Sequence, residues 1–174
     1  VWAGGYTAAN VIDYVAIATL GNATDFGDLT SNRNSHGGCG GGGRGLWMGG
    51  DTPSSPSATI DYVTISTPGN AVDFGDLTTA KIQAQACSSG YRGLYMGGNN
   101  GGTFYNNIDY VTIATTGNAI DFGDLTRTSS YNGACANKDR GICAGGYPPA
   151  VNNLDYVTIA TIGNASDFGD LTGT

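Results

Sequence analysis

The chain has 174 residues, of which 30 are glycine and only 12% are charged, where roughly a quarter is usual. All 14 acidic residues are Asp, and the formal net charge is -7. A chain with no Glu and this much glycine lacks the best helix formers, so an all-α fold is excluded. A nucleic-acid groove needs a basic surface, and a membrane span needs a long apolar run; the sequence has neither.

One motif occurs four times along the chain. Its copies begin at Ile12, Ile60, Ile108 and Leu154, and the third reads IDYVTIATTGNAIDFGDLT. A Cys, an Arg-Gly pair and a Gly-Gly pair recur upstream of the motif at matching distances. The repeat therefore divides a single repeat domain, 1-174, into a partial unit 1-30 without its first strand and three units of about 48 residues, 31-78, 79-126 and 127-174. Because the first unit is partial, we expect the chain to belong to a longer array or to assemble with copies of itself.

Each whole unit is expected to contain four short strands. In the unit 79-126 the first strand runs through KIQAQACS, and a polar turn leads into the second, RGLYMGG. The third, IDYVTIAT, is rich in β-branched and aromatic residues and carries apolar side chains on both faces, which predicts packing on both sides. A Gly-Asn turn then leads to a short fourth strand around Asp121-Phe122-Gly123.

Four strands per tandem unit of this length are typical of β-propeller blades. The Gly-Gly pairs at the ends of the second strands, and the cations Arg33 and Lys81 near the unit starts, resemble kelch repeats. Ser129 stands where the next cation would be, and Phe replaces the kelch Trp of the fourth strand. The string IDYV...GNA.DFGDLT more closely resembles tandem repeats in structural proteins of marine tailed phages, such as tail or fibre components. These resemblances imply an all-β, kelch-like β-propeller or propeller fragment with four-stranded blades, located on a virion surface or outside the cell.

The repeated Asp residues allow two interpretations. Paired carboxylates beside a Gly turn could hold Ca²⁺. The favoured alternative is structural: Asp caps tight turns and pairs with the Arg of each unit, and no metal is bound. The residues given this structural role are Asp25, Asp28, Arg44, Asp73, Asp76, Arg92, Asp121, Asp124, Arg140, Asp167 and Asp170.

The cysteines and the single histidine suggest no catalytic or metal site. Cys39, Cys87 and Cys135 occupy equivalent positions and are expected to be small buried hydrophobes. Cys143 takes a place held by aromatic residues in the other units, and a tight hairpin would make a Cys135-Cys143 disulfide feasible. A lone His and the absence of a C-x-x-C pair exclude a His-based triad and a zinc ribbon.

The loops that follow the Gly-Gly pairs differ most between units. In a propeller or solenoid such loops emerge together on one face, which is the usual binding face. Aromatic rings beside amides favour sugars as ligands. The alternative is that these are exposed loops of no specific function. The candidate ligand-binding residues are Tyr6, Asp51, Asn99, Asn100, Phe104, Tyr105 and Tyr147.

The sequence therefore predicts a non-enzymatic virion or appendage protein without cofactors. Its expected partners are copies of itself, other virion proteins and host surface glycans, with no nucleic acid and no membrane span. An alternative is a purely architectural, self-assembling repeat protein. A third interpretation, a propeller glycosidase, would need carboxylate pairs made from Asp alone, including a residue outside the repeat such as Asp51.

Overall fold

The computed structural model describes residues 1-5 and 9-173, which form strands and no helix. The first unit forms a three-stranded sheet of β1 (Trp2–Ala3), β2 (Val11–Tyr14) and β3 (Thr24–Asp28). The second forms a sheet of β4 (Gly37–Gly41), β5 (Arg44–Met48), β6 (Thr59–Thr64) and β7 (Val72–Asp76). The third contains β8 (Gln85–Ser88), β9 (Arg92–Met96), β10 (Asn107–Thr112) and β11 (Ile120–Asp124). The fourth contains β12 (Gly133–Ala136), β13 (Arg140–Gly146), β14 (Val151–Thr158) and β15 (Ser166–Asp170).

Every sheet is an antiparallel meander in chain order. The all-β class is therefore confirmed, and each sheet lies within one sequence unit. A β-bulge recurs in the last strand of every sheet. In β11, for example, Gly123 pairs with Ile108 and Asp121 with Asp109, so Phe122 is the extra residue. Such a bulge re-aims the side chains around it, and Phe26, Phe74 and Phe122 are all buried in the clusters that join their sheets to the next.

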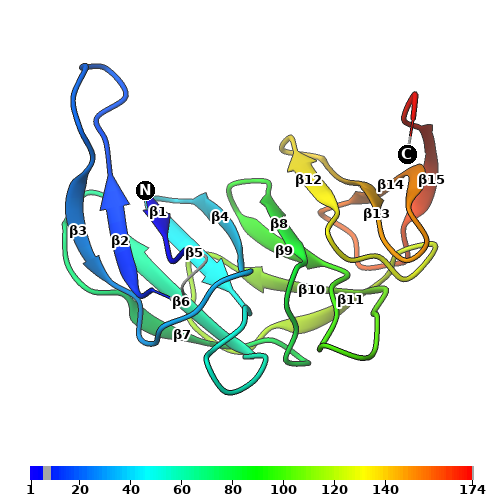
Figure 1. Ribbon diagram of the computed structural model, residues 1–174. Helices are drawn as coiled ribbons and strands as arrows, with labels where there is room; N and C mark the ends of the chain where they lie inside the picture. The colour runs from blue at the N-terminus through cyan, green and yellow to red at the C-terminus, as the bar shows by residue number, and fades with distance from the viewer. Residues whose placement is uncertain (6–8, 174) are drawn as a thin grey trace.

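Consecutive sheets pack face to face in chain order, from β1-β3 at one end to β12-β15 at the other (Figure 1). The first strands of the whole units lie side by side, β4 against β8 and β8 against β12. Each hydrophobic cluster joins two neighbouring sheets: Phe26 and Leu29 of the first sheet, for example, share a cluster with Trp47, Val63 and Ala71 of the second. The core is thus distributed between the sheets.

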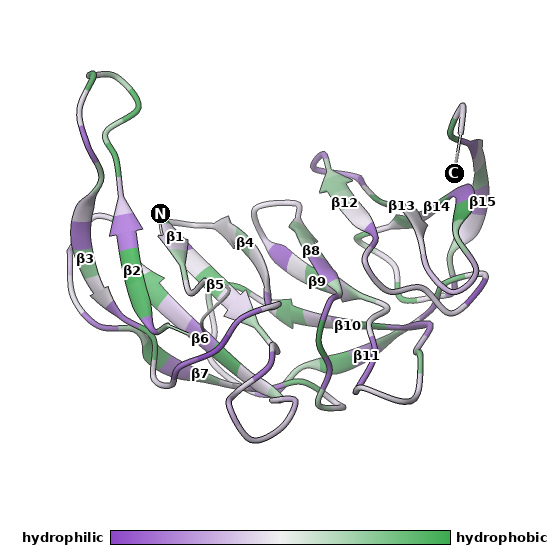
Figure 2. Cartoon of the chain, viewed as in Figure 1, coloured by the Kyte–Doolittle hydropathy of each residue, from purple (hydrophilic) through white to green (hydrophobic). Residues whose placement is uncertain are grey.

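Figure 2 shows hydrophobic residues along strands such as β10, and also at the tip of the loop between β2 and β3. That tip carries Ile17 and Leu20, both fully exposed. In the third and fourth sheets the counterparts of Ile17 are Ile113 and Ile159, which are buried. No described segment forms a helix that could cross a membrane.

Candidate functional site

The most distinctive polar groups are buried carboxylates where consecutive sheets meet. Asp61 of β6 accepts hydrogen bonds from the backbone N–H and the hydroxyl of Thr30 (3.0 and 2.7 Å), and its Oδ2 lies 2.7 Å from Nη2 of Arg33. Both Arg33 and Asp61 are fully buried. Arg33 also donates to the carbonyl oxygens of Thr59 (2.7 Å) and Trp47 (3.4 Å), so oxygen atoms of β5 and β6 surround its charge in the interior.

The next interface repeats this arrangement with a lysine. The ammonium of Lys81 lies 3.1 Å from Oδ2 of Asp109 and 3.0 Å from Oδ1 of Asn107, while the Thr78 hydroxyl donates to Asp109. Burial lowers the pKa of Lys81 below its ordinary value, and Asp109 opposes that shift. Burial likewise lowers the pKa of Arg33, opposed by Asp61.

The last interface keeps the carboxylate and lacks the cation. Asp155 is buried and accepts from the backbone N–H of Thr126 (2.9 Å) and from the Thr126 hydroxyl (2.8 Å). Ser129 stands where Arg33 and Lys81 stand in the earlier units, and its hydroxyl donates to the carbonyl oxygen of Gly145 (3.0 Å). Asn153 takes the position of Asn107, whose Oδ1 accepts a hydrogen bond from Lys81. The Oδ1 of Asn153 is buried and has no hydrogen-bond partner.

A second repeated contact joins the last strand of each of the first three sheets to the Gly-Asn-Ala turn of the next sheet. The N–H of Gly69 donates to the carbonyl oxygen of Phe26 (2.7 Å), that of Ala71 to Asp28 (2.7 Å), and the N–H of Asp28 to Oδ1 of Asn70 (3.1 Å). The same three bonds recur at the second interface, with residues 117-119, and at the third, with residues 163-165.

These contacts bring two chain segments so close that only glycine fits. A Cβ added at Gly27, Gly75 or Gly123 would lie about 2.5 Å from backbone atoms of the next sheet's turn. All three also have φ between +138° and +146°, a region that residues with a Cβ rarely adopt. The Gly of D-F-G-D is thus explained by the packing of one sheet on the next.

The structural role predicted for the D-F-G-D carboxylates agrees with their geometry in one respect. In each copy the first Asp side chain accepts from the N–H of the following Gly, as Asp25 does from Gly27 (3.1 Å). Within residues 1-5 and 9-173, no group of three or more His, Cys, Asp or Glu side chains is placed to hold a metal ion.

The predicted pairing of these Asp residues with the Arg of each unit is wrong. The guanidinium groups of Arg44, Arg92 and Arg140 lie over the rings of Tyr62, Tyr110 and Tyr156, at 4.5 to 4.8 Å from the ring centroids. Arg44 and Arg92 also donate to carbonyl oxygens of the following sheet, at Ile113 and Ile159. Among the described residues, the buried carboxylates that pair with cations belong to the IDYV motif, and their partners are the buried side chains of Arg33 and Lys81.

The candidate disulfide requires a correction too. The register of the hairpin sets Cys135 opposite Ile142 and Cys143 opposite Ala134, so the two side chains project from opposite faces of the sheet. All four cysteines are free. Burial raises the pKa of the Cys39, Cys87 and Cys143 thiols to about 12, which makes them unreactive packing groups. Cys135 is exposed, contrary to the expectation that it is buried.

The candidate loop residues do not form one site. Tyr6 lies outside the described residues. Asn99 is buried, and its amide donates to Gln83 and Ser130, so it holds the loop in place. Asp51 pairs through its backbone with Asn34 and Pro56.

Four of the predicted residues fall into two close pairs. Phe104 and Tyr147, from the third and fourth units, meet edge to face with ring centroids 5.9 Å apart. The amide of Asn100 donates to the hydroxyl of Tyr105 (2.8 Å). Tyr147 is 53% exposed, so one aromatic ring of the first pair remains available to a ligand.

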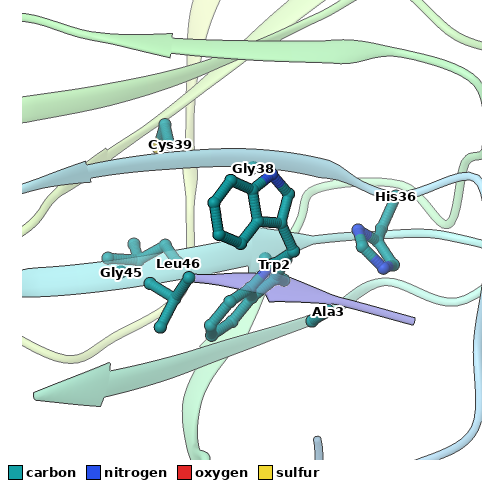
Figure 3. Close-up of a pocket in the computed structure, with 9 residues that line it drawn as sticks. Trp2, Ala3, His36, Gly38, Cys39, Gly45 and Leu46 are labelled. Carbon is teal, nitrogen blue, oxygen red and sulfur yellow. The ribbon is translucent and has the colours of Figure 1, made fainter. Parts of the chain in front are cut away.

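A cavity of about 400 Å³ lies where β1 approaches β4 and β5. Figure 3 shows Trp2, Ala3 and His36 around it, with Gly38 and Leu46. Burial, reinforced by the nearby Arg33 guanidinium, lowers the pKa of His36 to about 4. His36 is therefore neutral at physiological pH. The cavity itself was not predicted from the sequence.

No protein-family model matches the chain, and no curated protein sequence matches it significantly.

Proposed function

We propose that the protein is a non-enzymatic structural component of a virion or of another extracellular appendage, of the kind found in phage tails and fibres. The observation that carries this proposal is a contrast within the repeat. The contacts between sheets recur at each interface, whereas the loops after the Gly-Gly pairs differ in every unit. Repeated interfaces make a stiff scaffold, and variable loops on a scaffold are where recognition commonly resides.

The proposal includes a β-propeller, or part of one, as the architecture. It is supported by four-stranded meanders in the whole units, by the side-by-side placement of β4, β8 and β12, and by the face-to-face packing of successive sheets. An image of the assembled particle tests it. Blades arranged radially around an axis are expected, and a straight stack of sheets would contradict the propeller.

Host surface glycans are the ligands that the loop chemistry fits best. Tyr147 offers an exposed ring braced by Phe104, and the neighbouring loop presents Asn100 and Tyr105. Sugars pack their apolar faces on aromatic rings and hydrogen-bond through their hydroxyls, so this combination suits them.

A glycan array followed by titration of the bound sugars tests this recognition. We expect Tyr147→Ala to weaken binding at least tenfold, because it removes the exposed ring. Tyr91→Ala is the matched control: Tyr91 is 64% exposed, but it lies at the other end of β9 from the Phe104 loop. If no sugar binds, or if the two variants bind as the parent does, glycan recognition at this site is excluded.

A purely architectural role is the second candidate, and one observation favours it. Two apolar residues of the last sheet, Phe168 and Leu171, are exposed although their counterparts are buried between sheets. An architectural protein would use such surfaces to join copies of itself or neighbouring virion proteins. Finding the variable loops also covered in those contacts would favour this role over glycan binding.

A further inference from the structure

The two ends of the row of sheets carry the two unused halves of the interface that recurs inside the molecule. We call the face that packs on the next sheet in the chain the forward face, and the opposite one the backward face. The forward face of the last sheet carries Phe168 and Leu171. Trp2, Val15 and Ala23 occupy the sequence positions of Trp47, Val63 and Ala71, which pack on the preceding sheet, and so they mark the backward face of the first sheet.

Exposure shows that both surfaces are built for contact. Phe168 is 50% exposed, whereas its counterparts Phe26, Phe74 and Phe122 are at most 4% exposed. Leu171 is 40% exposed, against at most 5% for its three counterparts. Trp2, opposite Asp13 of β2, is 61% exposed, whereas Trp47, in the equivalent place opposite Asp61 of β6, is 5% exposed.

The polar groups at the two ends are complementary as well. Inside the chain, each forward face supplies the carbonyl oxygens of a Phe and an Asp, and each backward face supplies two turn N–H groups and an Asn oxygen. In the described part of the chain these bonds have no counterpart at Phe168 and Asp170, nor at the turn 21-23. Thr172 and Asp13 likewise repeat the sequence positions of Thr30 and Asp61 without making their hydrogen bonds.

One glycine points to the same conclusion. Gly27, Gly75 and Gly123 each sit where a Cβ would strike the next sheet's turn. Gly169 has the same unusual φ, +136°, and the space around it is open. The last sheet therefore keeps room for a Gly-Asn-Ala turn, and the first sheet has an unused turn of that kind at residues 21-23.

We propose that this chain binds a second copy of itself head to tail, with the forward face of β14 and β15 in one copy packed on the backward face of β2 and the turn 21-23 in the other. The contact reproduces the internal interfaces: Gly21 and Ala23 donate to the carbonyl oxygens of Phe168 and Asp170, and Thr172 donates to Asp13. Because the two surfaces differ, the contact is heterologous, and repeated copies form a ring if the rotation closes and a filament if it does not. This inference rests on the architectural role proposed above and not on glycan binding.

Sedimentation velocity over a wide range of concentration, with two blocking variants, tests the proposal. Leu171→Asp places a charge on the forward face and Ala23→Asp on the backward face; both residues are exposed, so each variant is expected to fold, as circular dichroism can verify. The parent should associate with rising concentration, and each variant alone should remain monomeric. An equal mixture should form a one-to-one dimer and nothing larger, because one intact forward face and one intact backward face remain.

Tyr91→Asp, on an exposed hairpin away from both surfaces, should associate as the parent does. A parent that stays monomeric, or a mixture that does not dimerise, would overturn the proposal. If Tyr147→Asp abolishes association while Leu171→Asp and Ala23→Asp do not, the copies contact each other through the variable loops. That result would support the architectural role and contradict the head-to-tail contact.

Discussion

At the scale of single residues, the interior charges determine how the sheets are joined. Asp61, Asp109 and Asp155 occupy the same position in three units, and only the first two have a cation beside them. A buried carboxylate without a counter-charge is costly, and removing one partner of a buried pair generally costs about 3-5 kcal/mol. The fourth unit avoids part of this cost through hydrogen bonds from Thr126 and Asn153.

Replacing Lys81 should therefore be strongly destabilising. We expect Lys81→Met to lower the free energy of unfolding by about 3-5 kcal/mol, because Asp109 is left buried and unpaired. Lys138→Met is the control: the Lys138 side chain is 85% exposed and lies 4.0 Å from Asp139, so its removal should change stability very little. Urea denaturation measures the free energy of unfolding of both variants. Equal losses for Lys81→Met and Lys138→Met would show that burial of the ion pair is unimportant.

The reverse change should stabilise the last interface. Ser129→Lys restores a cation at the position of Lys81 in a site where Asp155 and Asn153 supply the same oxygen atoms. We expect the free energy of unfolding of this variant to be about 1-3 kcal/mol higher than that of Ser129→Met. Ser129→Met adds a side chain of similar size without the charge. Equal stabilities for the two variants would mean that the ammonium does not reach Asp155.

His36 should make stability depend on pH. Its pKa is about 4 in the folded chain and about 6.5 when exposed, so the unfolded state binds the extra proton between these values. The stability contributed by neutral His36 is complete above about pH 6.5 and is lost as the pH falls towards 4. Because the side chain is partly exposed, we expect a loss on the order of 1-2 kcal/mol. Thermal unfolding of His36→Gln should show a flatter pH profile than the parent in this window; identical profiles would contradict the assignment.

At the scale of strands and turns, the repeat predicted the number and order of the strands, because β-branched runs, Gly-Gly pairs and Gly-Asn turns mark them locally. It did not predict which residues meet across an interface. Arg33 lies in the connection between β3 and β4, 28 residues before Asp61 of β6, and the choice between Arg33 and Arg44 as the partner depends on side-chain direction. The hairpin register that separates Cys135 from Cys143 differs by one residue from a disulfide-compatible one, and composition does not specify it.

The close approach of strand and turn gives a prediction at this scale. Gly75→Ala and Gly169→Ala impose similar backbone strain, since φ is +141° and +136°. Only at Gly75 would the new Cβ collide with backbone atoms of the next sheet. Chemical denaturation should therefore show Gly75→Ala to be less stable than Gly169→Ala by about 1-3 kcal/mol. Equal losses would mean that the glycines are required for their φ alone.

At the scale of the whole molecule, four similar sheets are held by one kind of interface used three times. Each sheet contacts its neighbours, so stability should propagate from interface to interface as it does in other repeat proteins. The sequence repeat made this modular plan predictable. The complementary exposed ends were not predictable, because they follow from which residues lie on which face of the first and last sheets.

Amide hydrogen exchange measured by NMR tests the interface most directly. The N–H groups of the turns at residues 69-71, 117-119 and 163-165 donate to the preceding sheet, and the turn at residues 21-23 is their unused counterpart. We predict strong protection at Gly69, Ala71 and their equivalents in the third and fourth units at every concentration. Gly21 and Ala23 should exchange freely in dilute samples and become protected as copies associate. Similar exchange at all four turns under dilute conditions, or a turn 21-23 that stays unprotected in associated samples, would contradict the account.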